Sequence, residues 1–97
     1  MMNRQQTLDI LTRLKPELIK RFGITRLALF GSTVRNEARE DSDIDIIVSF
    51  DGSATSKQYF GVQFLLEDEL GQSIDLVTEK ALRPELKTFI ENEVVNV

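Results

Sequence analysis

The 97-residue sequence contains neither cysteine nor histidine. The absence of cysteine excludes a disulfide framework, a thiolate zinc site and a cysteine nucleophile. The absence of histidine removes histidine-based catalytic triads and most zinc or copper sites. Any metal bound by this chain must therefore be held by oxygen ligands, which favours magnesium, manganese or calcium.

Long apolar runs and excess positive charge are also missing. No apolar stretch approaches the length of a membrane span, and the N-terminus lacks the apolar block of a signal peptide. The net charge of −4 argues against direct binding to a nucleic-acid backbone. With 41% apolar and 29% charged residues, the composition is that of an ordinary folded domain. We therefore expect a cytoplasmic protein with no membrane and no nucleic-acid contact.

Apolar periodicity and turn residues predict the local structure along the chain. The expected elements are a helix over 5–22, a strand over 26–30, a short helix from 32 through about 36 capped by Ser32, a strand over 44–50, a helix over 56–70, a strand over 73–78, a helix over 84–92, and an apolar tail over 94–97 that adds to a sheet edge or to a partner.

Two features of the helices carry specific expectations. Pro16 predicts a kink or break near 14–15, because proline removes a backbone donor and crowds the preceding turn, and Gly23 provides a stop for that helix. The apolar positions expected to form helix faces are Phe60, Val62, Phe64, Leu65 and Leu66 in the helix over 56–70, and Leu86, Phe89 and Ile90, turned inward, in the helix over 84–92.

The resulting order is αβαβαβα, an α/β (α+β) fold with a small mixed sheet flanked by helices. The strands over 44–50 and 73–78, joined by a helix, form a βαβ unit and should be parallel. If Ser32 and Asp43 share one site, the strand over 26–30 must run antiparallel to the strand over 44–50.

Three carboxylates accompany the strands. Asp43 and Asp45 lie two residues apart, so they point to one face of their strand. At a separation of about 4 Å and an effective dielectric near 20, two such charges repel by roughly 4 kcal/mol, which water and distance, a basic neighbour or a metal must offset. Asp75 stands in an otherwise apolar strand and could reach the same edge. Three convergent carboxylates with open positions are what a two-metal phosphoryl-transfer site requires.

A complementary phosphate-binding turn follows the strand over 26–30. Gly31 lets a phosphate approach the backbone, and Ser32 offers a hydroxyl at a predicted helix N-terminus. Arg35, one turn later, could reach a phosphate or close a salt bridge over the loop. Taken singly, each of these residues has a simpler interpretation as a turn, a cap or a surface charge, and only their order and spacing make the pattern specific.

Gly31-Ser32, ten intervening residues and Asp43-x-Asp45 resemble the polymerase-beta-type nucleotidyltransferase superfamily. The sequences Leu-Phe-Gly-Ser-x-x-Arg, Asp-Ser-Asp-Ile-Asp-Ile-Ile-Val-Ser-Phe and Ile-Asp-Leu-Val-Thr-Glu-Lys-Ala-Leu-x-Pro-x-Leu are similar to its minimal branch, the antitoxins of HEPN–nucleotidyltransferase pairs. This resemblance covers nearly the whole chain and implies one minimal nucleotidyltransferase domain over 1–97.

The resemblance also implies an activity: transfer of AMP from ATP, with two Mg²⁺ ions, to a tyrosine hydroxyl of a HEPN-type ribonuclease toxin. By position, Asp43, Asp45 and Asp75 would be the catalytic metal ligands, and Gly31, Ser32 and Arg35 would bind the nucleotide. The family usually has glycine after this arginine, whereas this chain has Asn36. Because asparagine tolerates left-handed geometry, we expect the turn to survive.

Several alternatives remain open at the level of sequence. They are an antitoxin that masks the toxin by binding alone, a nucleotidyltransferase with another acceptor, and a small nucleotide-binding regulatory module. Only about twenty residues follow the last predicted strand, which disfavours a separate domain for binding a small-molecule acceptor. The sequence leaves both homo- and hetero-oligomers open.

Overall fold

The computed structural model describes residues 3–39 and 42–97. Within these ranges the predicted element order is confirmed, with the short second helix formed as a 3₁₀ helix and with a fourth strand at the end. The elements are α1 (Arg4–Phe22), β1 (Ile24–Phe30), η1 (Gly31–Thr33), β2 (Ile44–Phe50), α2 (Ser56–Leu70), β3 (Ile74–Thr78), η2 (Glu79–Ala81), α3 (Pro84–Glu91) and β4 (Val95–Asn96). No helix in the described part of the chain has both the length and the apolarity needed to cross a membrane.

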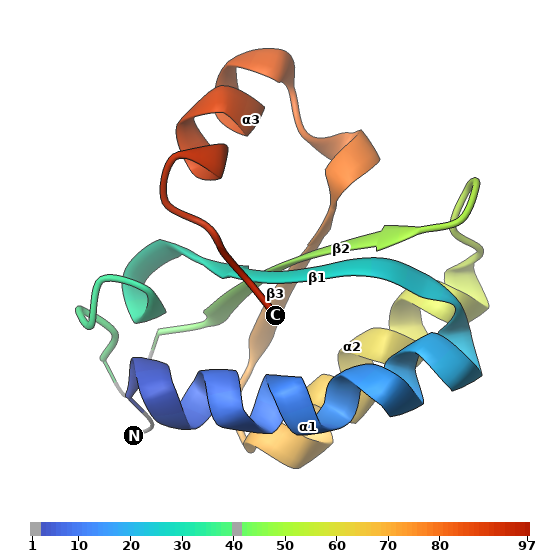
Figure 1. Cartoon of the computed structure of the whole chain (residues 1–97), viewed down its shortest axis with the longest axis horizontal. Helices are drawn as coiled ribbons and strands as arrows, with labels where there is room; N and C mark the ends of the chain where they lie inside the picture. The colour runs from blue at the N-terminus through green and yellow to red at the C-terminus, as the bar shows by residue number, and fades with distance from the viewer. Residues whose placement is uncertain (1–2, 40–41) are drawn as a thin grey trace.

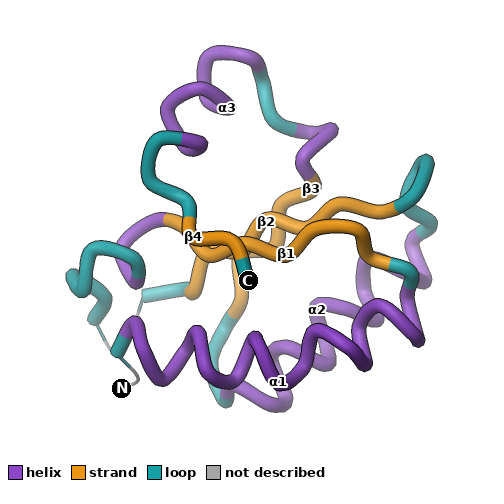
Figure 2. The backbone as a smooth tube through the Cα atoms, in the orientation of Figure 1, coloured by secondary structure: helices purple, strands orange, loops and turns teal. Residues whose placement is uncertain are grey.

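The strands form one mixed sheet in the order β3-β2-β1-β4. β1 and β2 are antiparallel and β2 and β3 are parallel, so both predicted pairings are confirmed. The apolar tail joins the sheet edge, since Val95 pairs with Leu29 of β1. Figure 1 shows α1 and α2 together on one side of the sheet and α3 on the other. The strand layer between them is clearest in Figure 2.

Alternate residues of β2 point into two different layers, as strand geometry requires. Ile44 and Ile46 belong to the main core together with Leu11 of α1. Ile47 belongs instead to a small apolar cluster that includes Ile90 of α3. The odd-numbered residues of β2 therefore project toward the side of the sheet that carries α3.

Of the kink or break that Pro16 predicts near residues 14–15, the break does not occur, because α1 is continuous from Arg4 to Phe22. A proline inside a helix costs the hydrogen bond to the carbonyl four residues earlier. Leu14 and Leu18 are buried on either side of it, and burial of one such leucine contributes about 2 kcal/mol. Packing of α1 on the sheet therefore outweighs the local penalty. The predicted stop is confirmed, since Gly23 is left-handed at φ 69° and ends α1.

Helix α2 buries a narrower stripe than its apolar content predicts. Its buried residues are Val62, Leu66 and Leu70, which recur at four-residue steps. Phe60 and Phe64 are 48% and 64% exposed. Phe60 and Phe64 are also four residues apart, but each lies two positions before a buried residue, so they lie on another side of the helix. The prediction of one broad apolar face including these phenylalanines is wrong.

Helix α3 likewise turns only part of its apolar surface inward. Ile90 is 8% exposed, as predicted, but Leu86 and Phe89 are 51% and 67% exposed, so their predicted inward orientation is wrong. The helix spans only eight residues, and a helix this short can bury little more than one turn of side chains against a sheet.

Charged groups supply much of the remaining attachment of α3. Arg26 of β1 donates hydrogen bonds to both carboxylate oxygens of Glu91, at 2.7 and 3.0 Å. Arg26 also donates to the Asn96 side chain at 3.0 Å. The bonds from Arg26 lower the pKa of the Glu91 carboxyl. Together, the three hydrogen bonds connect β1 with α3 and with β4.

Candidate active site

Asp45 and Asp75 lie side by side on neighbouring strands. They are register partners in the parallel pairing of β2 with β3, and neighbouring strands are about 4.8 Å apart. Because Ile74 and Leu76 belong to the main core, Asp75 projects to the opposite face, which is also the face of Asp45. The predicted convergence of these two carboxylates is confirmed.

The environment of Asp45 opposes its ionisation. Partial burial, followed by the charge of Asp75 and a hydrogen-bonding contact with it, raises the pKa of Asp45 to about 6. The charge of Asp43 acts in the same direction, while Arg35 acts weakly against it. The pair therefore has an excess of negative charge that the protein itself leaves uncompensated.

Asp43 lies outside the strands, unlike Asp45 and Asp75. It immediately precedes β2 and is exposed to solvent. The described ranges contain no group of three acidic side chains already gathered closely enough to hold a metal ion. The structure thus brings together a carboxylate pair, with Asp43 near enough for its charge to affect Asp45.

This donor set fits a hard divalent cation. All candidate ligands are carboxylate oxygens, which suit Mg²⁺, and Mg²⁺ needs only one or two of them because water and phosphate complete its shell. Burial and the charge of Asp75 together raise the pKa of Asp45, and a cation beside the pair would offset both effects.

Gly31 places the end of β1 directly against Asp45. Its backbone is left-handed at φ +77°, and a Cβ added to it would clash with Asp45 Oδ2. Only glycine satisfies both requirements, so the turn and the carboxylate are fitted to one another. Phe30 is the register partner of Asp45 in the antiparallel pairing, which explains this approach.

Ser32 lies in η1, beside this contact, but its predicted role as a helix cap is wrong. The cap position belongs to Phe30, and no side chain caps η1. The glycine in αL geometry forces the chain into a 3₁₀ turn that begins one residue earlier than predicted. Next to it, Thr33 is 2% exposed and its hydroxyl has no hydrogen-bond partner among the described residues. The sequence analysis did not identify Thr33 as a site residue. Its position in the turn is the one feature of the sequence that could have indicated it.

Arg35 closes a salt bridge over the loop, the second of its two predicted roles. It contacts Glu37 at 3.0 Å and Glu93 at 2.9 Å. Hydrogen bonds to these glutamates raise its pKa further. Binding of a phosphate by Arg35 stays a prediction. Asn36 is left-handed at φ 56°, which confirms that asparagine supports the turn where the family has glycine.

Comparison with known proteins agrees with this geometry. The profile of the nucleotidyltransferase domain matches residues 11–97. The chain belongs to the nucleotidyltransferase family. A relative from Thermococcus cleftensis, named protein adenylyltransferase MntA, is 38% identical over 97 residues, which cover all of this chain and 98% of the relative.

Solved structures show the same fold for this nucleotidyltransferase. A structure described as a minimal nucleotidyltransferase has a TM-score of 0.84 at 34% identity and covers 99% of this chain and 97% of that one. A chain from the complex of a tri-AMPylated Shewanella oneidensis HEPN toxin with its MNT antitoxin has a TM-score of 0.68 at 19% identity. That match covers 96% of the nucleotidyltransferase and 70% of the other chain, and it concerns the fold alone.

Proposed function

We propose that this nucleotidyltransferase is an antitoxin that transfers AMP from ATP to a tyrosine hydroxyl of a cognate HEPN-type ribonuclease toxin. One observation supports this above all: Asp45 and Asp75 are register partners beside the left-handed Gly31 turn, where any side chain would meet Asp45. Paired carboxylates next to a turn with close backbone access are the parts that phosphoryl transfer requires.

In the proposed reaction, the hydroxyl oxygen of the acceptor forms a bond to the α-phosphorus of ATP. The bond from the α-phosphorus to the bridging oxygen breaks, and pyrophosphate leaves with the electron pair. Asp75 takes the hydroxyl proton, because it is the more exposed member of the pair. Gly31 and Ser32 position the triphosphate, and Arg35 contributes positive charge to it.

Two Mg²⁺ ions would be held by Asp43, Asp45 and Asp75. When bound, these ions would neutralise phosphate charge and stabilise the leaving group. Asp45 fits this role best, because burial and the charge of Asp75 both oppose its ionised form, which a bound cation would favour.

Two comparisons favour a protein acceptor over a small molecule. The relative that aligns with the whole chain is named a protein adenylyltransferase. The Shewanella oneidensis complex contains a toxin that carries AMP groups beside an antitoxin of the same fold.

Transfer can be tested in parallel reactions with ATP labelled at the α-phosphate or at the γ-phosphate, each with Mg²⁺ and the purified HEPN-type protein from the same genome. We expect the partner to gain α-label but no γ-label, and Asp45→Asn to abolish labelling. Toxin inhibition that persists fully in the double variant Asp43→Asn/Asp45→Asn, without any label, would instead identify an antitoxin that acts by masking.

A further inference from the structure

A groove lies at the other end of the sheet from the carboxylate pair. It has a volume of about 800 Å³ and opens where β2 and β3 end, between α2 and η2. We call it the distal groove. Along β2, Phe50 at the groove is five residue steps from Asp45, which corresponds to about 16 Å, and along β3, Thr78 is three steps from Asp75, which corresponds to about 10 Å. The nucleotide site and the distal groove are therefore separate places on the same molecule.

Aromatic side chains form one wall of the distal groove and continue onto the surface. The Tyr59 hydroxyl donates a hydrogen bond to the Leu76 carbonyl, which fixes its ring. Tyr59 meets Phe60 edge-on at 5.2 Å, and Phe60 stacks with Phe64 at 6.2 Å. Phe60 lines the groove, whereas Phe64 lies outside it. The aromatic surface is thus larger than the hollow itself.

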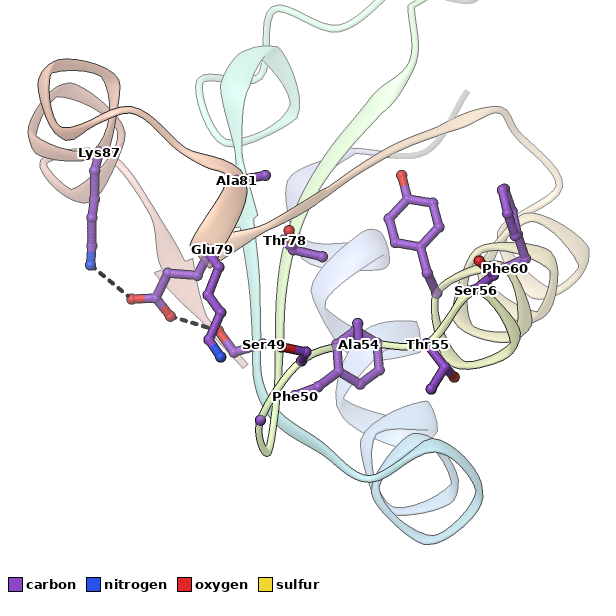
Figure 3. Close-up of a pocket in the computed structure, with 14 residues that line it drawn as sticks. Ser49, Phe50, Ala54, Thr55, Ser56, Phe60, Thr78, Glu79, Ala81 and Lys87 are labelled. Carbon is purple, nitrogen blue, oxygen red and sulfur yellow. Dashed lines mark hydrogen bonds and ion pairs between the residues drawn. The ribbon is translucent and has the colours of Figure 1, made fainter.

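The opposite wall is charged and has a surplus of lysine. Figure 3 shows Phe60 and Ser56 on one side of the groove and Glu79 and Lys87 on the other. The negative charge of Glu79 is already engaged, by Ser49 at 2.6 Å and Lys87 at 3.3 Å, and the Ser49 bond lowers the pKa of Glu79. Lys80 also lines the groove and has no ion-pair partner among the residues that the structure describes.

We infer that the distal groove docks the protein that accepts the nucleotidyl group, through an apolar side chain flanked by acidic residues. This inference rests on the proposed function, because it requires a protein acceptor. Lys80 complements acidic side chains, although the chain as a whole is negative. Exposed aromatic residues such as Phe60 and Phe64 are typical of interface centres.

The distance between the carboxylate pair and the distal groove also favours one kind of partner. A ligand that touches the distal groove at Thr78 and presents a hydroxyl at Asp75 must span about 10 Å or more, because three strand residues separate these two positions. A folded protein does this easily, and a single amino acid or sugar does not. Docking at a distance would bring the acceptor to the site without any contact that competes with ATP.

Site-specific photocrosslinking in the native cell tests the inference. A photoreactive phenylalanine replaces Phe60 in one variant and Ile19 in a matched control. Ile19 is a good control because it is 47% exposed, close to the 48% of Phe60, and lies outside the groove. We expect position 60, but not position 19, to crosslink to a protein that also takes label from ATP, through a segment containing acidic and apolar residues.

Charge reversal provides a second measurement that leaves the core untouched. Lys80→Glu should weaken binding of the crosslinked protein about tenfold or more, because like charges would then meet. Lys20→Glu, an exposed lysine on α1, should leave binding unchanged. Binding of a non-hydrolysable ATP analogue should be the same in both variants and in wild type.

Specific outcomes would overturn the inference. They are equal crosslinking at positions 60 and 19, crosslinks only to a second copy of this chain, or a crosslinked protein that takes no label while another protein does. In this last case the proposed function survives and only the docking site is wrong. If no protein takes label at all, the proposed function fails as well.

Discussion

Replacing Asp45 by asparagine should make the protein more stable while it abolishes transfer. In the metal-free protein, Asp45 and Asp75 are register partners whose charges repel. The substitution would keep the size and polarity of the side chain and remove one of the two charges. Stability and activity should therefore change in opposite directions, as expected where a functional site stores unfavourable charge.

The magnitude follows from the separation of the strands. At roughly 4.8 Å and an effective dielectric near 20, two unit charges repel by about 3.5 kcal/mol. Asp75 is exposed and Asp45 half-buried, so solvent screening reduces this to about 1 kcal/mol. For a domain of this size, that corresponds to a rise in Tm of about 4–8 °C.

The pH dependence has a definite sign. The pKa of Asp45 is raised to about 6 in the folded protein, whereas an unfolded aspartate titrates near 3.9. Its protonated form therefore stabilises the fold below about pH 3.9, and this contribution is lost as pH rises through about 6. The Tm advantage of Asp45→Asn should be nearly absent at about pH 3.5, below the unfolded pKa, and fully developed at about pH 8.

Thermal unfolding in chelator, followed by circular dichroism at both pH values, measures this effect. Asp51→Asn is the control, since Asp51 is exposed in the turn after β2 and should show no pH-dependent gain. A Tm for Asp45→Asn that is equal to or below that of wild type at the higher pH would refute the claim that the pair is uncompensated. Loss of transfer should exceed about a hundredfold, the upper range for changes to groups that only orient the ligands of a metal.

Three further predictions concern the turn, the attachment of α3 and the metal. Gly31→Ala should cost about 2–4 kcal/mol in urea unfolding, from left-handed strain and the clash with Asp45; an equal cost in an Asp45→Ala background would contradict the clash. Arg26→Ala should lower the free energy of unfolding by about 1–2 kcal/mol and expose α3 to proteolysis. The control Arg13→Ala, which breaks an exposed ion pair at 3.5 Å, should lower it by less than about 0.5 kcal/mol. Equal costs for the two variants would show that α3 does not depend on the Arg26–Glu91 contact. Mg²⁺ at a hundredfold excess over its Kd should stabilise wild type by about 2.7 kcal/mol, while chelator or calcium should leave the fold intact but stop transfer; robust transfer in excess chelator would contradict a metal-dependent site.

The sheet and the carboxylate pair were predictable from sequence because they depend on short-range patterns. β2 and α2 have the predicted bounds, since β-branched runs and glycine stops define them. Two-residue alternation puts Asp45 on the face away from Ile44 and Ile46, and the parallel βαβ rule puts Asp75 on the neighbouring strand. These rules need no knowledge of distant contacts.

The errors arose where distant contacts decide the outcome. The sequence indicated a salt bridge of Arg35 over the loop but not its partner Glu93, which lies 58 positions away. The exposure of Phe89 depends on how α3 lies over the sheet, which its own sequence does not specify. The continuity of α1 through Pro16 depends on packing of its buried leucines. Tertiary contacts override local preference in each case.

The distal groove could not be predicted for the same reason. Its residues come from the ends of β2 and β3, from α2, from η2 and from α3. Each has an ordinary local interpretation, and Lys80 taken alone indicates only a surface charge. Their juxtaposition becomes visible only when the parallel strands end at the same level of the sheet.

Mass spectrometry of the partner after reaction tests the central claim most directly. The purified HEPN-type protein from the same genome is incubated with ATP, Mg²⁺ and either wild type or Asp45→Asn, and the modified peptide is sequenced. We predict added AMP on a tyrosine with wild type alone. An unmodified partner whose ribonuclease activity is nevertheless blocked by both proteins would contradict catalysis at the Asp45–Asp75 pair.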